Sequence, residues 1–410
     1  MVEVSHMNRI RKTYKDLAVF QGEPFFSEKL HVGRPNIGDE SILLERLQDI
    51  LQRRWLTNDG PYVREMEEEI CKLTGVKHCI AVNNATLGLE IAARSLDLKG
   101  EVIVPSFTFI ATAHALQWLG IKPVFCDVDP QTHNIDPAKV EALISEQTTG
   151  IVGVHLWGRP CDIQTLTEIA RKHDLKLLFD AAHAFGCSFE GRMLGNFGDA
   201  EVYSFHATKF LNSFEGGAIV TNDEQVAEKA RALRNFGYDC SDNIAFAGTN
   251  GKMSEISAAM GLTGLASMDD FINVNSRNYL TYVAELANVP GIHVIDYDAK
   301  ERNNYQYIIL EIDEQKCGLK RDDLMKILYS ENVLARRYFH PGCHRAGPYA
   351  SDESYSNLDL PETERLSACV LALPNGTAVS ENEIKDICQI IRVCVNHAEE
   401  IRSKLNYVLA

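Results

Sequence analysis

The stretch that decides the fold is residues 101–129, which read EVIVPSFTFIATAHALQWLGIKPVFCDVD. It begins with a short apolar segment, continues near residues 110–119 with apolar side chains at helical spacing, and ends with a second apolar segment. Short apolar runs of this length are typical of buried strands. The order strand, helix, strand predicts two parallel strands joined by a crossover helix.

The same alternation extends over residues 78–220. Amphipathic segments separate apolar segments that read HCIAV, EVIVP, KPVFCDV, GIVGVH and KLLFD. A regular exchange between strand and helix is the pattern of an α/β protein in which helices connect parallel strands. We therefore expect an α/β fold with a mostly parallel sheet in this part of the chain.

After about residue 265 the pattern changes. A long polar helix at 268–287 leads to shorter strands, and a final helix begins at Ser380 with a capping-box glutamate three residues later. A chain of 410 residues is also long for one core. We expect an N-terminal segment and a large domain in residues 1–265 and a smaller α+β domain in residues 266–410.

Composition excludes several classes of protein. The net charge of −16, with no long basic run, argues against nucleic-acid binding, since phosphates would be repelled. No apolar run approaches the roughly 18 residues that span a bilayer, and the first twenty residues lack the apolar core of a signal peptide. The 11 cysteines contain no CxxC pair, so neither disulfides nor a zinc site is expected. These features predict a cytoplasmic protein without bound metal.

Chemistry-bearing residues follow several of the expected strands. Ligands of α/β sheets sit outside the carboxyl ends of the strands, where these residues would converge. They are a helix start at Ala85 and Thr86, an aromatic at Phe109, a carboxylate at Asp180, an imidazole at His183 and an amine at Lys209. A glycine pair, Gly216 and Gly217, follows the lysine and would let the backbone bend closely beside a ligand.

Each residue alone has an ordinary structural explanation, such as a helix cap, a core aromatic or a solvated lysine. Together they match one cofactor. A lysine forms a Schiff base with an aldehyde, a carboxylate keeps a pyridine nitrogen protonated, a helix N-terminus binds phosphate, and an aromatic stacks on the ring. Pyridoxal 5'-phosphate has a chemical group for each of these four interactions.

Four motifs carry a family resemblance that covers roughly residues 32–375. They read PSFTFIATAHALQWLGIKPVFCDVDPQTHNID, FDAAHAFG, SFHATKFLNSFEGGAIVT and GTNGKMSEISAAMGL. Together they resemble the DegT/DnrJ/EryC1/StrS family of pyridoxal-phosphate-dependent nucleotide-sugar aminotransferases. The resemblance implies the fold of aspartate aminotransferase, called fold type I, in which residues 1–265 would bind the cofactor. It also implies a homodimer with active sites shared at the subunit interface.

The resemblance also implies a role for each site residue. Lys209 would hold the cofactor and later move a proton, and Asp180 would pair with the pyridinium nitrogen. His183 stands where many members have glutamine, and it would bind the phenolic oxygen. The remaining cofactor contacts would be Phe109 over the ring, Ser204, Ala85 and Thr86 at the phosphate, and Asn250 reaching the phosphate from the neighbouring subunit.

The implied reaction moves an amino group from glutamate to a keto-sugar nucleotide. The segments VHLWGRPCD and ARRYFHPGCHRAGPY resemble the subgroup that makes dTDP-4-amino-4,6-dideoxyglucose from dTDP-4-keto-6-deoxyglucose. Guanidinium groups suit diphosphate oxygens. The expected substrate contacts are Arg159, Arg336 and Arg337 at the diphosphate, with Glu215, His340, His344 and Tyr349 at the sugar or nucleotide. Phe214 replaces the usual glycine before the E-G-G motif, which hints at the substrate.

Three other functions stay open at this stage. Relatives with the same cofactor residues aminate C3 of a 3-keto sugar. Other relatives are sugar dehydratases, in which a histidine replaces the Schiff-base lysine, whereas Lys209 is present here. A non-catalytic regulatory protein that binds the cofactor on the same scaffold is the third alternative, because fold does not fix function.

Overall fold

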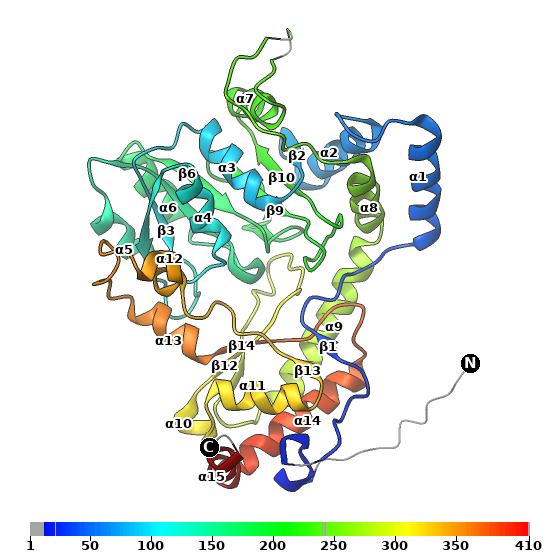
Figure 1. Cartoon of the computed structure of the whole chain (residues 1–410), viewed down its shortest axis with the longest axis vertical. Helices are drawn as coiled ribbons and strands as arrows, with labels where there is room; N and C mark the ends of the chain where they lie inside the picture. The colour runs from blue at the N-terminus through cyan, green and yellow to red at the C-terminus, as the bar shows by residue number, and fades with distance from the viewer. Residues whose placement is uncertain (1–11, 21, 240, 242, 409–410) are drawn as a thin grey trace.

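The computed structural model describes residues 12–20, 22–239, 241 and 243–408 (Figure 1). Its centre is a seven-stranded sheet in the order β2-β10-β9-β6-β5-β3-β4. The strand β10 is antiparallel to both of its neighbours, and all other neighbours are parallel. The strands are β2 (His78–Val82), β3 (Glu101–Pro105), β4 (Lys122–Cys126), β5 (Thr148–Val154), β6 (Lys176–Asp180), β9 (Ala200–Ser204) and β10 (Gly217–Thr221). The expected α/β fold with a mostly parallel sheet is confirmed.

Helices cover both faces of this sheet, and each face has its own core. Leu89, Ala113 and Ala227 pack with strand side chains on one face, and Met66, Leu166 and Phe271 do so on the other. Burial on both faces explains why the strand segments are continuously apolar. The helices of this part are α1 (Glu40–Arg53), α2 (Pro61–Thr74), α3 (Ala85–Ser95), α4 (Ala111–Trp118), α5 (Pro137–Val140), α6 (Ile163–Lys172), α7 (Glu224–Arg234) and α8 (Glu255–Ala266).

The C-terminal part contains a three-stranded antiparallel sheet in the order β11-β12-β14. Long helices pack beside it, and α14 begins with the expected capping box between Ser380 and Glu383. A break at Ser267 separates α8 from α9, close to the expected domain boundary, which stays a prediction. The elements are α9 (Met268–Leu286), β11 (Ile292–Val294), β12 (Ile308–Ile312), α10 (Glu314–Cys317), α11 (Arg321–Ser330), β13 (Val333–Leu334), α12 (Gly347–Ala350), α13 (Pro361–Cys369), β14 (Val370–Leu373), α14 (Glu381–Asn396) and α15 (Ala398–Val408).

The N-terminal segment packs on the C-terminal part. Its strand β1 (Leu30–His31) pairs in parallel with β13, and Leu17 and Phe26 lie in the same core as the helices α11 and α14. The contacts of residues 17–31 therefore join this segment to residues far along the chain, and its grouping with the large domain stays a prediction. No helix in the described ranges is long and apolar enough to cross a membrane. A small hairpin joins β7 (Ser188–Phe189) and β8 (Arg192–Met193).

A buried carboxylate ties the large sheet to the C-terminal part. Asp127, one residue beyond β4, accepts hydrogen bonds from the backbone N–H and the hydroxyl of Thr363, both at 2.8 Å, and from Lys139 at 2.9 Å. The backbone N–H of Glu362 also donates to it at 3.2 Å. Burial alone would raise the pKa of Asp127, but the hydrogen bonds from Lys139 and Thr363 outweigh it, so the pKa lies below its ordinary value.

We expect Asp127→Ala to lower the free energy of unfolding by about 2–4 kcal/mol, because it leaves buried donors of Thr363 without an acceptor. Denaturant titration should show this loss, and Asp296→Ala, at a side chain that is 79% exposed, should change stability by less than about 0.5 kcal/mol. Because the pKa of the Asp127 carboxyl is lower in the folded than in the unfolded state, its ionised form stabilises the fold above the unfolded-state pKa. This stabilisation is lost as the pH falls. The difference between wild type and Asp127→Ala should therefore shrink below about pH 4. Equal losses in both variants would contradict the prediction.

Candidate active site

The site residues converge because their strands end at one edge of the sheet (Figure 1). Asp180 is the last residue of β6, and Ser204 is the last residue of the neighbouring parallel strand β9. Lys209 lies in the turn after β9, and its N–H donates to the carbonyl of His206 at 2.8 Å. The helix α3 starts at Ala85, beyond the end of β2.

A glycine permits the close approach between this turn and α3. Gly217 is paired with Ser204, and a Cβ atom at Gly217 would lie 2.9 Å from the backbone nitrogen of Ala85. No real side chain tolerates a carbon at that distance, so only glycine fits. Gly217, the second glycine of the E-G-G motif, therefore allows the phosphate-binding candidates Ser204 and Ala85 to lie close together.

Lys209 is largely enclosed, and its environment prepares it to act as a base. Burial lowers the pKa of its amine to about 8, although the nearby Asp180 carboxylate acts in the opposite direction. A free amine is consequently much more abundant at neutral pH than for an ordinary lysine, whose pKa is near 10.4. The amine nitrogen Nζ lies 3.5 Å from the hydroxyl of Tyr307.

Asp180 is a buried carboxylate with few donors. The hydroxyl of Thr112 donates to its Oδ2 at 2.8 Å, and the N–H of Ala182 donates to its Oδ1 at 3.0 Å. Burial raises the pKa of Asp180, against those two hydrogen bonds and the charges of Lys209 and His155. A buried carboxylate of this kind is stabilised by a cationic N–H partner, which a pyridinium ring would supply.

His183 is held as a neutral ring of defined orientation. The backbone N–H of Trp157 donates to its Nδ1 at 3.1 Å, which places the ring proton on Nε2. Burial, with a contribution from Lys209, holds the pKa of His183 well below its usual range. The ring packs against Tyr307, with 4.4 Å between centroids, so its Nε2–H is the remaining donor for an oxygen acceptor.

The start of α3 offers an anion cradle. The side chain of Asn84 accepts the N–H of Leu87 at 2.9 Å, which fixes the first turn. The backbone N–H groups of Ala85 and Thr86 belong to the first turn of the helix, where no intrahelical acceptor exists. With Ser204 beside them and Lys209, Asp180 and His183 along the sheet edge, the described residues fit the phosphate, ring and aldehyde of pyridoxal phosphate.

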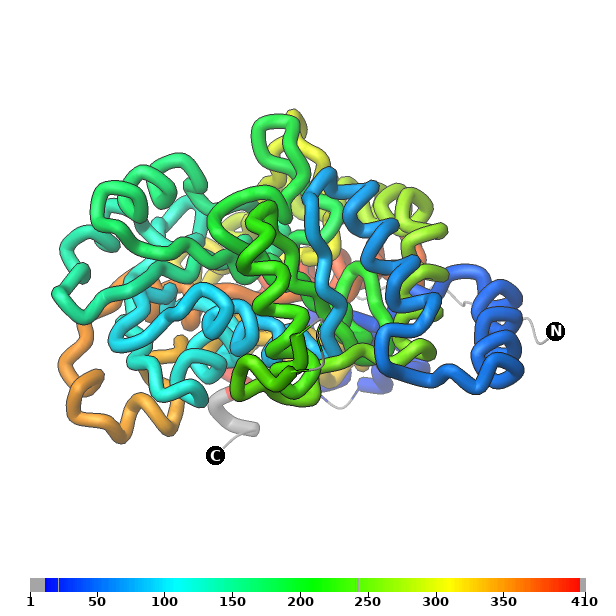
Figure 2. Tube along the Cα trace, turned by 90° about the horizontal axis from the view of Figure 1, so that it is seen from above, coloured from blue at the N-terminus to red at the C-terminus, as the bar shows by residue number. Residues whose placement is uncertain are grey.

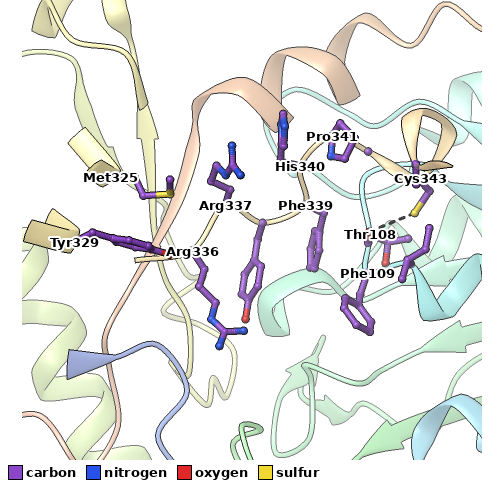
Figure 3. Close-up of a pocket in the computed structure, with 14 residues that line it drawn as sticks. Thr108, Phe109, Met325, Tyr329, Arg336, Arg337, Phe339, His340, Pro341 and Cys343 are labelled. Atoms are coloured by element: carbon purple, nitrogen blue, oxygen red, sulfur yellow. Dashed lines mark hydrogen bonds between the residues drawn. The ribbon is translucent and has the colours of Figure 1, made fainter. Parts of the chain in front are cut away.

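A cavity of about 610 Å³ is lined by Phe339, whose ring stacks 6.1 Å from that of His183, but Lys209, Asp180 and His183 themselves do not line it (Figure 3). Phe109 is 57% exposed and faces Phe339, with 6.5 Å between ring centroids. The side chains of Arg336 and Arg337 point in opposite directions, and Arg337 also pairs with Asp322 at 3.5 Å. Four of the site residues expected from sequence line this cavity together with Phe339, and they are Phe109, Arg336, Arg337 and His340.

The structure does not bring His344 and Tyr349 to this cavity. His344 is buried, with Nδ1 2.7 Å from the hydroxyl of Ser106 and Nε2 3.4 Å from Glu364. Tyr349 is buried against Phe125, with 4.9 Å between ring centroids. Both side chains are buried, and the Tyr349 hydroxyl has no hydrogen-bond partner among the described residues. The expectation that these two contact the sugar or nucleotide stays a prediction.

Three other expected contacts also lie away from the residues that line the cavity. The guanidinium of Arg159 donates to the carbonyl of Gln131 at 3.2 Å. Glu215 is exposed and pairs with His206 at 3.5 Å. Asn250 is exposed and accepts a hydrogen bond from Lys252 at 2.7 Å.

Sequence reasoning missed several residues that complete the site. Thr112 was visible as a hydroxyl in the segment after β3, but nothing in the sequence linked it to Asp180. Trp157 acts through its backbone N–H, a group that nearly every residue has, so its side chain gives no indication of this role. Tyr307 comes from the C-terminal part and meets Lys209 across 98 positions of sequence.

The comparisons with known proteins agree with this geometry. The model of the DegT/DnrJ/EryC1/StrS aminotransferase family matches residues 38–392. The dTDP-4-amino-4,6-dideoxy-D-glucose transaminase of Shigella dysenteriae is 38% identical over 367 residues, which cover 88% of this chain and 98% of that protein. The GDP-perosamine synthase of Caulobacter vibrioides is 34% identical over 82% of this chain and 91% of that protein.

A solved structure extends the similarity to three dimensions. The crystal structure of DesI in the presence of its TDP-sugar product superposes with a TM-score of 0.92 and 49% identity. The match covers 96% of this chain and 99% of that one, and it confirms the expected fold. The chain belongs to the DegT/DnrJ/EryC1/StrS aminotransferase family.

Proposed function

We propose that this sugar aminotransferase transfers an amino group from glutamate to C4 of 4-keto-6-deoxyglucose carried on dTDP. The observation that carries the proposal is the near full-length similarity to the Shigella dysenteriae transaminase, together with the set of Lys209, Asp180 and His183 at one edge of the large sheet. The similarity to DesI, which was crystallised with its TDP-sugar product, points to the same class of substrate.

Pyridoxal phosphate, when bound, supplies an electron-accepting ring that carries the amino group between the two substrates. The chain holds and orients it. Asp180 would hold the ring nitrogen, the Nε2–H of His183 would donate to an oxygen, and Ser204 with the amides of Ala85 and Thr86 would hold the phosphate.

Lys209 moves the proton. With a pKa of about 8, its Nζ can take a proton as a free amine and return it as an ammonium at near-neutral pH. A pKa near the working pH suits both halves of the reaction, in which the proton travels in opposite directions.

The cavity suits a deoxysugar diphosphate. Phe109 and Phe339 form an apolar wall that matches a C6 methyl group, because a hydroxyl placed there would lose its hydrogen bonds with water. Arg336 supplies a guanidinium at the rim, which suits phosphate oxygens. Arg337 shares its charge with Asp322, so its contribution to a diphosphate is expected to be smaller.

A homodimer is part of the proposal. Apolar side chains are exposed on and after α1, at Leu51, Trp55 and Leu56, and Figure 2 places this helix at one end of the molecule. Further exposed apolar residues lie at Phe236 and Ile244, in the segment that projects beyond α7 in Figure 1. Apolar surface of this kind is typical of an interface. The exposed Asn250 lies in the same region and would reach the partner's phosphate.

The first prediction from this proposal concerns the amine of Lys209. Lys209→Ala should abolish transamination and the covalent attachment of the cofactor, because no other group supplies the proton-transferring amine at that place. The absorption spectrum with pyridoxal phosphate and the turnover of glutamate measure both effects. Lys300→Ala, at an exposed turn, should behave as wild type. Near-normal turnover in Lys209→Ala would remove this lysine from the mechanism.

The second prediction concerns the shared site. Asn250→Ala should retain less cofactor after gel filtration, since one phosphate donor is lost. In a homodimer with shared sites, mixing Asn250→Ala with Lys209→Ala should restore activity, because one of the two sites in a mixed dimer then has both residues intact. Mixtures whose activity does not exceed the sum of the separate variants, despite verified subunit exchange, would count against a shared site.

The third prediction decides the substrate. Incubation with glutamate and either dTDP-4-keto-6-deoxyglucose or a 3-keto isomer should give product only with the 4-keto sugar, with nitrogen at C4 by NMR. Nitrogen at C3 would establish the 3-keto alternative and leave aminotransfer intact. A deoxygenated product without nitrogen would indicate a dehydratase, and no product from a wider panel of keto-sugar nucleotides would favour a regulatory protein.

A further inference from the structure

A tyrosine from the C-terminal part faces the proton-transferring amine. The hydroxyl oxygen of Tyr307 lies 3.5 Å from Nζ of Lys209, at the outer limit of a hydrogen bond. Tyr307 immediately precedes β12 and is 7% exposed. Neither the sequence motifs nor the roles described above use this residue.

The surroundings hold Tyr307 in one place. Its backbone carbonyl accepts a hydrogen bond from the hydroxyl of Tyr297 at 2.8 Å. The same hydroxyl lies 3.2 Å from the carbonyl of Trp157, whose N–H orients His183. The ring of Tyr307 also packs on the ring of His183. The phenol is therefore fixed relative to two of the residues that act on the cofactor.

The phenol stays neutral under working conditions. Burial raises the pKa of Tyr307 well above its usual value, so the hydroxyl keeps its proton wherever Lys209 titrates. Its oxygen can accept an N–H of the ammonium, and its O–H can donate to the lone pair of the free amine, so the phenol can hold the lysine in either protonation state. That interaction stabilises the ammonium more than the amine, because a charged donor forms the stronger hydrogen bond.

We propose that Tyr307 is a positioning residue, whose hydroxyl holds the Lys209 amine in place whenever that amine is not bonded to the cofactor. The proposal rests on the proposed role of Lys209 in proton transfer. A lysine side chain has four rotatable bonds, and an amine released during the reaction would otherwise sample many positions. Holding it beside the site keeps the proton acceptor within reach of the reacting carbon.

Two effects should separate positioning from simple packing. Tyr307→Phe keeps the ring on His183 but removes the acceptor, so the ammonium of Lys209 is less stable and the pKa of Lys209 should fall by about half a unit to one unit. Loss of orientation should reduce kcat by about tenfold or more, with little change in the KM for the sugar. A residue that merely packs would move neither the pKa nor kcat in this pattern.

The deciding experiment uses the full chain without cofactor. Lys209 is acetylated in competition with a free reference amine between pH 6 and 10, and mass spectrometry of the Lys209 peptide gives the midpoint of its titration. We expect a midpoint near 8 for the wild type and a lower midpoint for Tyr307→Phe. Tyr305→Phe is the matched control, because Tyr305 lies two residues before Tyr307 and its ring packs on Tyr279 and Tyr297. The substitution removes a hydroxyl but keeps that ring. Its midpoint should equal that of the wild type.

An unchanged midpoint in Tyr307→Phe overturns the proposal. This result is independent of the proposed function, since the labelling uses neither substrate nor cofactor and would stand whichever sugar the enzyme aminates. Thermal unfolding of each variant checks the fold. If Tyr307→Phe does not fold, Tyr307→Leu provides the same loss of hydroxyl, and an unchanged midpoint there equally overturns the proposal. A midpoint that rises in either variant also contradicts it.

Discussion

The burial of the Lys209 amine beside the Asp180 carboxylate is the constraint on which the rest of the site depends. Burial disfavours the charged form of each group, and the attraction between them only partly compensates. The pair is consequently prepared for a molecule that brings a cation to the carboxylate and an electrophile to the amine. The parallel pairing of β6 with β9 sets this arrangement, because Asp180 ends one strand and Lys209 follows the next.

The sequence was sufficient to predict the positions of residues that are set by a single strand or helix. Asp180, Ser204 and Ala85 each lie at the end of a strand or the start of a helix, so once the strands are recognised the sheet edge brings these residues together. The same reasoning predicted the α/β fold, since each strand and helix is marked by its own apolar period. Motif resemblance added the identity of the cofactor and the family, which the comparisons confirm.

Sequence failed where distant segments meet. The run from Arg336 to Tyr349 is rich in groups that could bind a sugar, but it crosses between surface and interior, so Arg336 reaches the cavity whereas Tyr349 is buried. No periodicity marks that change, because the segment forms only short helical turns. Tyr307 was invisible for the same reason, since its partner lies in another part of the chain. The N-terminal strand β1 likewise pairs with a segment about 300 residues later.

The buried His344 does not line the cavity, but it fixes segments that do. Its Nδ1 bonds the hydroxyl of Ser106, and the neighbouring N–H of Cys343 donates to the carbonyl of Ser106 at 2.8 Å. These bonds attach the segment that carries Phe339 to the end of β3, three residues before Phe109. The two aromatic walls of the cavity are thus set against each other by a buried histidine. In the proposed function, the large sheet would supply the groups that act on the cofactor, and both parts would supply the surface that meets the sugar, since Phe109 follows β3 and Phe339 belongs to the C-terminal part. On that proposal, specificity would depend on how these buried contacts align the two parts as well as on the side chains at the cavity.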